Sequence, residues 1–157
     1  MQAPSPPDVA RLGYDILTFV GIIEHLARTR ASRGLKAAGV SFPQFVLLNH
    51  FVRRPAEEAK TVSSVARAMQ QPQPGITKTI QKMIAQGLLR VIPATHDRRV
   101  KLLMLTPKGQ RAHQKALEQL APLFAPAFEE WAPQELTTLA QHLLRLKEWL
   151  DTKGRLD

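Results

Sequence analysis

The chain has 157 residues, of which 44% are hydrophobic and 22% charged, with no cysteine and a net charge of +9. This composition is typical of a folded domain, and the lack of cysteine excludes disulfides, thiol nucleophiles and cysteine zinc sites. The longest stretch without a charged residue, 37–52, has 16 residues against the ~20 that cross a bilayer, and the first residues lack a signal-peptide pattern, so we expect a cytoplasmic protein without membrane contact.

The N-terminal part of the chain predicts a tail and one long helix. Residues 1–7 are rich in proline, and we expect them to be disordered. From Val9 to about Arg33, apolar residues recur at steps of three and four, which is the spacing of an amphipathic helix. This apolar stripe is long enough to need a partner molecule to cover it. Gly34 and Gly39 are expected to loosen the chain after the helix.

A second helix is predicted to start at residues 41–43, where a serine and a proline form a typical helix start. It should end before Pro55 and lead into a charged loop over residues 53–60. The side chains expected to point inward are Phe45, Leu48, Phe51 and Val52.

The next segment predicts a short helix, a turn and a further helix. Thr61 can cap the short helix, and two prolines within residues 70–74 predict the turn. Residues 75–86 form the further helix, and Gly87 fits the left-handed position just after its end. The apolar stripe of the further helix is formed by Ile76, Ile80, Met83 and Ile84.

The pattern then changes to two short extended runs, residues 88–93 and 100–105, joined by a polar link that suits the tip of a hairpin. Thr106 and Pro107 predict the start of another helix. In that helix Ala112, Ala116, Leu120, Phe124 and Phe128 are expected to point inward. Two prolines, at positions 122 and 126, should kink or break it, and a last helix starts near residue 133.

The order of elements from residue 61 to 105 is that of a winged helix-turn-helix, and the charge supports this reading. Residues 60–111 carry ten basic residues and one acidic residue, which accounts for the whole net charge of +9. Such a concentration favours a polyanionic partner, although a solvated basic face without a partner has the same pattern. The basic residues are Lys60, Arg67, Lys78, Lys82, Arg90, Arg98, Arg99, Lys101, Lys108 and Arg111.

Two motifs in this region resemble the multiple-antibiotic-resistance regulators, the MarR family. Residues 76–90, ITKTIQKMIAQGLLR, are similar to the family pattern V-T-R-L-V-D-R-L-E-x-x-G-L-V-x-R. Residues 97–99, DRR, and residues 103–109, LMLTPKG, are similar to its wing pattern D-x-R-x-x-x-L-x-L-T-x-x-G. With the flanking helices the resemblance covers about residues 10–150.

The resemblance implies a mainly α fold with a small β-hairpin wing, in which residues 41–106 form the DNA-binding domain and residues 8–40 and 107–157 the helical dimerisation region. It also implies a nucleoid-associated homodimer that binds a pseudo-palindromic operator in double-stranded DNA, usually as a repressor. A small aromatic or phenolic effector is implied, in a pocket whose residues the sequence does not identify. No cofactor or metal is expected.

The groups on the predicted recognition helix and wing are those that read and hold duplex DNA. On the helix, the candidate contacts are Gln73, Thr77, Lys78, Gln81 and Lys82. On the wing they are Arg98, Arg99 and Lys101, of which Arg99 matches the wing-tip arginine of the family and Asp97 is expected to brace the turn.

Departures from the family pattern leave alternatives open. Pro72 and Pro74 stand where the family usually has a serine cap and small polar residues, and Thr79 stands where leucine is common. Because proline lacks an N–H donor, phosphate anchoring is expected to be weaker. A winged-helix protein-interaction module that has lost operator binding is therefore the alternative. An enzyme is a third, less favoured hypothesis, since the sequence contains no catalytic constellation.

Overall fold

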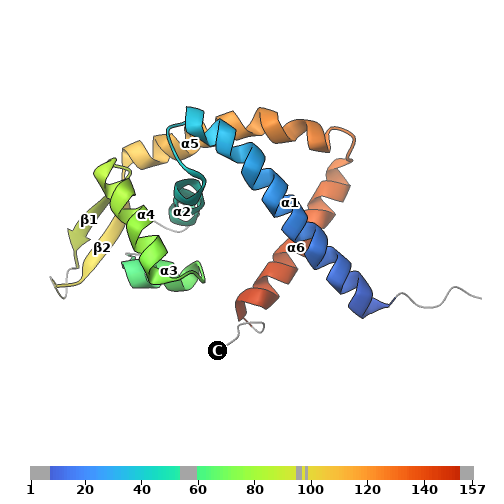
Figure 1. Ribbon diagram of the computed structural model, residues 1–157, viewed down its shortest axis with the longest axis horizontal. Helices are drawn as coiled ribbons and strands as arrows, with labels where there is room; N and C mark the ends of the chain where they lie inside the picture. The colour runs from blue at the N-terminus through green and yellow to red at the C-terminus, as the bar shows by residue number, and fades with distance from the viewer. Residues whose placement is uncertain (1–7, 54–59, 95–96, 98, 153–157) are drawn as a thin grey trace, which may run out of the picture. The chain divides into compact units, whose positions relative to one another are not determined.

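The computed structural model describes residues 8–53, 60–94, 97 and 99–152. In this part of the chain it shows six α-helices, a short 3₁₀ helix and a two-stranded antiparallel sheet (Figure 1). The predicted fold class, mainly α with a β-hairpin, is confirmed. The structure has two compact units, one ending at Leu123 and one beginning at Phe124. The tail predicted over residues 1–7 lies outside the described residues.

Helix α1, Val9–Ala37, continues beyond its predicted end at Arg33. Gly34 does not loosen it, because this glycine serves packing. A Cβ atom at Gly34 would lie 2.9 Å from a methyl group of Leu123 and 3.3 Å from a backbone carbonyl oxygen of α5, Pro107–Phe124. A glycine therefore lets the two helix backbones approach closely while α1 remains helical.

Helix α2, Phe42–Val52, begins where it was predicted, with Ser41 as its first cap. The side-chain oxygen of Gln44 accepts the backbone N–H of Ser41 at 2.8 Å and so satisfies a donor at the helix start. The prediction that Val52 points inward is wrong, because Val52 is 38% exposed. The inward face runs at steps of three and four through Gln44, Leu47, Leu48 and Phe51.

Helix α3, Val62–Ala68, is capped by Thr61, whose hydroxyl oxygen accepts the N–H of Ser64 at 3.1 Å. Helix α4, Gln73–Ala85, begins two residues before the predicted start at residue 75. Pro74 lies in the first turn of α4, where a backbone N–H has no acceptor within the helix, so the missing N–H of proline costs no helical hydrogen bond. The buried stripe of α4 is formed by Ile76, Ile80 and Met83.

The end of α4 leads into the hairpin through the predicted left-handed glycine. Gly87 has a φ of 72°, and the N–H of Leu88 donates to the carbonyl of Met83 at 2.9 Å. Strands β1, Leu89–Pro93, and β2, Lys101–Leu105, then pair in antiparallel fashion, with Leu89 opposite Leu105. Both strands start one residue later than predicted.

Lys60 was predicted to end a charged loop, but it lies against the hairpin. It is 6% exposed and pairs with Leu103 as an isolated bridge on the outer side of β2, with its carbonyl accepting the N–H of Leu103 at 2.7 Å. Its ammonium nitrogen lies 5.0 Å from the ring centre of Phe51. The sequence pattern does not indicate this bridge, because a single pairing residue leaves no periodicity.

The start of α5 is fastened to the corner between α4 and β1. The hydroxyl of Thr106 donates to the carbonyl of Gly87 at 2.7 Å and accepts the N–H of Gly109 at 3.0 Å. The ammonium group of Lys108 donates to the carbonyl of Gln86 at 2.7 Å and thereby caps the C-terminus of α4. These bonds join the recognition helix, the hairpin and α5 into one body.

Replacing Gly109 by alanine is expected to lower the free energy of unfolding by about 1–3 kcal/mol. An added Cβ at this position would lie 2.2 Å from the carbonyl oxygen of Leu88, so backbone must move. Urea denaturation followed by circular dichroism measures the effect. Gly75→Ala is the matched control, since a Cβ there meets nothing within 4 Å and alanine raises helix propensity. Equal stability of the two variants would contradict this packing argument.

The prolines in the C-terminal part act differently from one another. Pro122 lies inside α5 without ending it, whereas Pro126 lies in the first turn of the 3₁₀ helix, Ala125–Phe128, that follows. Phe128 is 45% exposed, so the prediction that it points inward is wrong. Helix α6, Pro133–Thr152, then forms most of the second unit and has no buried residue.

Candidate nucleic-acid interface

The five residues predicted on the recognition helix are distributed over two sides of α4. Gln73, Lys78 and Gln81 are exposed on the side away from the buried stripe. Thr77 is half-buried, and its hydroxyl donates to the carbonyl of Gln73 at 2.8 Å. Lys82 is also exposed but lines a hollow between α4, α1 and α2, which we call the α1–α2–α4 hollow.

The N-terminus of α4 lacks a side-chain cap. Pro72 occupies the cap position and makes no side-chain hydrogen bond to the helix, in contrast to Thr61 at the start of α3. The positive end of the helix dipole is therefore not neutralised by a capping group. Because Pro74 has no N–H, fewer backbone donors are available to an anion than at an ordinary helix start.

The wing tip is held by a local hydrogen bond. A carboxylate oxygen of Asp97 accepts the backbone N–H of Arg99 at 2.8 Å, and the carbonyl of Asp97 accepts the N–H of Val100 at 3.0 Å. The Arg99 side chain is exposed, as is that of Lys101 at the start of β2. Arg98, the other predicted wing residue, lies outside the described residues.

The structure separates the basic residues of 60–111 into exposed and structural groups. Lys78, Arg90 and Arg99 are exposed on α4 and the hairpin. Lys60 is buried, and the exposed Lys108 directs its ammonium group to the carbonyl of Gln86 at the end of α4. Within the described residues of this segment Asp97 is the sole carboxylate, and it faces a backbone N–H. The exposed surface of α4 and the wing is therefore positive.

A buried amide pair, which the sequence analysis missed, connects α2 to the end of α4. Gln44 is 2% exposed, and its side-chain nitrogen donates to the side-chain oxygen of Gln86. A glutamine in the first turn of a helix signals a capping box, but it does not identify its second partner. The pair fixes the base of the α1–α2–α4 hollow.

His113 on α5 forms a second buried polar contact with α2. Its Nε2 lies 2.7 Å from the side-chain oxygen of Asn49, and its ring stacks on Phe45 with centres 5.8 Å apart. Burial, and then the positive charge of Arg53, lower the pKa of the imidazole from its ordinary value of 6.5. The neutral imidazole is therefore the form that the fold favours.

This lowered pKa predicts a loss of stability in mild acid. Below the ordinary pKa of 6.5 the unfolded chain binds a proton that folded His113 resists, so the free energy of unfolding falls until the pH reaches the lowered value. His113→Gln keeps an amide partner for Asn49 and should remove this component. Urea denaturation between about pH 5 and pH 8 measures the difference between the two proteins. Identical pH profiles would contradict the assignment to His113.

Among the described residues, no group of three or more histidine, aspartate and glutamate side chains is placed to hold a metal ion. None of the helices seen in the structure is both long enough and apolar enough to cross a membrane.

Comparison with known proteins agrees with the arrangement of α3, α4 and the hairpin. Residues 38–100 match the sequence model of the MarR family. A solved MarR family protein from Bacillus stearothermophilus has the same fold, with a TM-score of 0.74 and 20% identity over 92% of this chain and 99% of that chain. Over residues 38–100 the chain is therefore similar to the MarR family, and its fold is that of solved members of this family. This fold is the winged helix of DNA-binding transcriptional regulators.

Two other proteins similar to this chain have names that describe different properties. The transcriptional activatory protein BadR of Rhodopseudomonas palustris is 24% identical over 127 residues, which are 80% of this chain and 71% of BadR. CouR from Rhodococcus jostii RHA1, solved bound to p-coumaroyl-CoA, is similar with a TM-score of 0.71 and 16% identity over 93% of this chain and 98% of CouR.

Proposed function

We propose that this MarR protein is a homodimeric repressor that binds a pseudo-palindromic operator, with α4 in the major groove and the hairpin in the minor groove. The observation that carries the proposal is the exposed cationic and amide surface of α4 beside a wing tip that presents Arg99. Gln73, Thr77, Lys78 and Gln81 are the proposed groove contacts. Lys82, Arg98 and Lys101 are proposed to bind phosphates, while Asp97 braces the wing.

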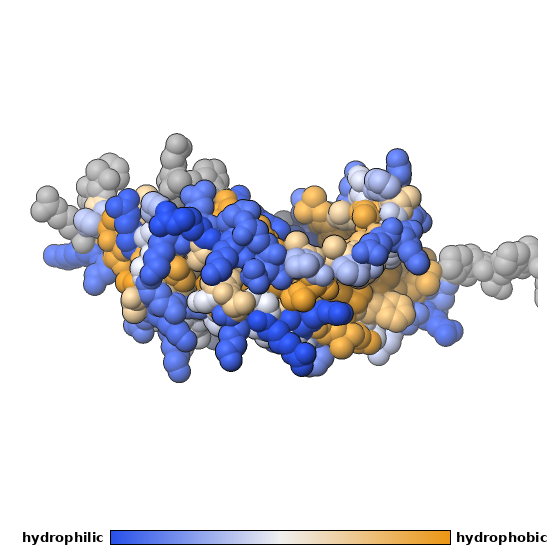
Figure 2. Space-filling model, turned by 90° about the horizontal axis from the view of Figure 1, so that it is seen from above, coloured by the Kyte–Doolittle hydropathy of each residue, from blue (hydrophilic) through white to orange (hydrophobic). Residues whose placement is uncertain are grey.

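The dimer is supported by the uncovered apolar surface of α1. Figure 2 shows hydrophobic surface around the N-terminal half of this helix, where ten large apolar side chains are exposed. A monomer in water rarely leaves such a surface uncovered. We propose residues 8–40 and 107–157 as the dimerisation region and 41–106 as the DNA-binding domain. The exposed side chains of α1 are Val9, Leu12, Tyr14, Ile16, Leu17, Phe19, Val20, Ile22, Ile23 and Leu26.

The second unit supports the same dimer from its own residues. Trp131 is 43% exposed and Trp149 53% exposed, as expected of aromatic side chains that become buried on association. A small aromatic effector is supported by the p-coumaroyl-CoA named with the CouR structure. A cytoplasmic, nucleoid-associated location follows from the proposed binding of operator DNA.

Fluorescence anisotropy with DNA from upstream of the chain's own and neighbouring genes tests the proposal. Binding in the nanomolar range that weakens steeply with salt is expected, because lysine and arginine release counterions from phosphates. Sedimentation of the complex should give two protomers per operator. A transcription assay on the bound promoter then distinguishes repression from the activation implied by the name of BadR. A folded dimer that binds no DNA but retains an acidic protein partner would favour the interaction-module alternative.

A further inference from the structure

Helix α4 carries few groups that can distinguish one base pair from another. Guanine is commonly read by arginine, and α4 contains no arginine. Which bases the helix can read therefore depends on the hydrogen-bonding groups that its other polar side chains still offer to a partner. These side chains belong to two glutamines, two threonines and two lysines: Gln73, Thr77, Lys78, Thr79, Gln81 and Lys82.

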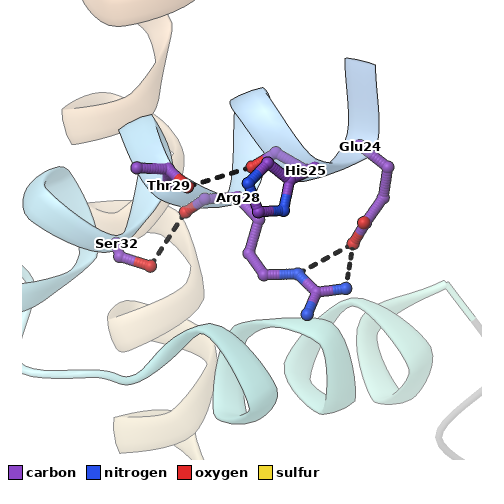
Figure 3. A network of polar contacts seen from close by, with 5 residues as sticks. All are labelled: Glu24, His25, Arg28, Thr29 and Ser32. Atoms are coloured by element: carbon purple, nitrogen blue, oxygen red, sulfur yellow. Dashed lines mark hydrogen bonds and ion pairs between the residues drawn. The ribbon is translucent and has the colours of Figure 1, made fainter. Parts of the chain in front are cut away.

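The hydroxyl protons of both threonines are used within the helix. Thr77 and Thr79 each donate to the backbone carbonyl four residues earlier, at 2.8 Å and 3.1 Å. Thr29 and Ser32 on α1 bond in the same way to carbonyls one turn before them, as Figure 3 shows. A threonine bonded in this way has no proton left for a base, and only its methyl group and oxygen lone pairs remain.

The two lysines supply charge without a strong choice of base. Lys82 lines the α1–α2–α4 hollow, and Lys78 is exposed on the side away from the buried stripe. An ammonium group has three donors and no acceptor, so a phosphate oxygen satisfies it as well as the acceptors of guanine do. We therefore expect the contribution of the lysines to binding to depend little on the DNA sequence.

The two glutamines offer both a donor and an acceptor. Gln73 and Gln81 are exposed, and in the part of the chain that the structure describes neither side-chain amide makes a hydrogen bond. The amide of Gln86, by contrast, accepts from Gln44. A side-chain amide matches the N6 donor and the N7 acceptor of adenine in the major groove. Eight residues separate the two glutamines, which places them about 12 Å apart along the helix axis, or about three to four base pairs of duplex.

Prolines on both sides of Gln73 restrict the backbone that carries its amide. Pro72 occupies the cap position with a φ of −55°, and Pro74 lies in the first turn of α4. Because each proline ring fixes φ, less conformational entropy is lost when this turn binds a partner. The same prolines leave fewer backbone donors for a phosphate. The side-chain amide of Gln73 is therefore a main hydrogen-bonding group at this end of the helix.

We propose that Gln73 and Gln81 determine the sequence specificity of this chain, each by reading one adenine in the major groove. Each operator half-site then contains two adenines, on either strand, about three to four base pairs apart. The inference rests on the proposed function and adds the base that α4 selects. Thr77 lies between the two glutamines and has a methyl group but no available proton, which suits contact with the methyl group of thymine.

Selection from a pool of random duplexes, followed by sequencing, tests this readout. The wild type should enrich adenine at two positions in each half-site. Gln81→Arg should replace adenine by guanine at one of them and leave the other unchanged, because arginine matches N7 and O6 of guanine. Gln73→Ala should remove the preference at the other position. Lys101→Gln is the control, since loss of a phosphate contact should weaken binding to all sequences and leave the base preferences unchanged.

The analogue 7-deazaadenine tests the atom that is read, because it replaces N7 by a C–H group and still pairs with thymine. Placed at either adenine of one half-site, it should weaken wild-type binding about three- to tenfold in fluorescence anisotropy. In Gln81→Ala it should have no further effect at the adenine assigned to Gln81 and its full effect at the other. Equal effects in the wild type and the variant at both positions would overturn the assignment.

The outcomes separate the readout from the proposed function. A folded protein that selects no duplex overturns both. A selected operator with the same base preferences in the wild type, Gln73→Ala and Gln81→Arg overturns the readout and keeps DNA binding. Selection of a base pair other than A·T at the positions that respond to these substitutions overturns the choice of adenine. Circular dichroism verifies the fold of each variant, which should be unchanged because both side chains are exposed.

Discussion

Replacing Arg99 by alanine is expected to weaken operator binding about a hundredfold. Each arginine at a groove contributes about 1–3 kcal/mol, and a dimer uses two wings. The turn that presents Arg99 is held by the bond from its own N–H to Asp97, so the substitution removes the guanidinium and leaves the turn intact. Fluorescence anisotropy across a series of salt concentrations should also show a slope lower by about two ions.

The control for this prediction is Lys115→Ala on α5, which removes one positive charge at an exposed position that is neither a proposed DNA contact nor one of the exposed apolar side chains assigned to the dimer, and sedimentation checks that the dimer remains. It should change affinity by less than about threefold. Equal losses in the two variants would attribute the effect to net charge instead of the wing. An unchanged Kd in Arg99→Ala would show that the wing tip does not contact DNA.

A double substitution on α1, Phe19→Asp with Ile23→Asp, should convert the protein to a monomer and abolish specific binding. These side chains are 61% and 63% exposed in the single chain, and four residues apart they share one helix face. Two carboxylates buried in an apolar interface would be strongly unfavourable. The loss of a second linked reading head should lower operator affinity by about a hundredfold or more.

Sedimentation equilibrium measures the oligomeric state, and circular dichroism verifies that the monomer remains helical. Ser63→Asp introduces the same charge at an exposed position of α3, outside the proposed dimerisation region, and it should leave the dimer intact. A double variant that stays dimeric with full operator affinity would exclude α1 as the interface.

The order of elements was predictable because each boundary has a local chemical cause. Thr61 caps α3, Gly87 takes the left-handed position after α4, and Thr106 with Pro107 starts α5. These signals depend only on neighbouring residues. The winged helix could therefore be derived before any tertiary contact was known.

The errors arose where distant residues decide the outcome. Gly34 was expected to loosen α1, yet it permits close packing against Leu123, which is far away in the sequence. Lys60 was assigned to a charged loop, yet it pairs with Leu103 on the hairpin. A window of neighbouring residues does not contain such partners.

The residue types of the candidate site could be predicted from the sequence. Which of these residues face outward and which border a hollow could not. Periodicity assigned Lys82 to the recognition surface together with Lys78. Only the packing of α1 and α2 against α4 shows that Lys82 borders a hollow that also contains Arg28. The sequence alone thus identified Lys82 as a positive charge on α4. Its position at the edge of the α1–α2–α4 hollow could be seen only in the fold.

The hydrogen bonds between the start of α5 and the C-terminal end of α4 restrict how the winged helix can move. Because Thr106 and Lys108 hold the carbonyls of Gly87 and Gln86, a tilt of α4 carries the hairpin and the first turn of α5 with it. In the proposed dimer, an effector is therefore expected to act on the separation of two rigid heads. Operators that differ only in the spacer between their half-sites should respond differently to the effector, even with identical base contacts.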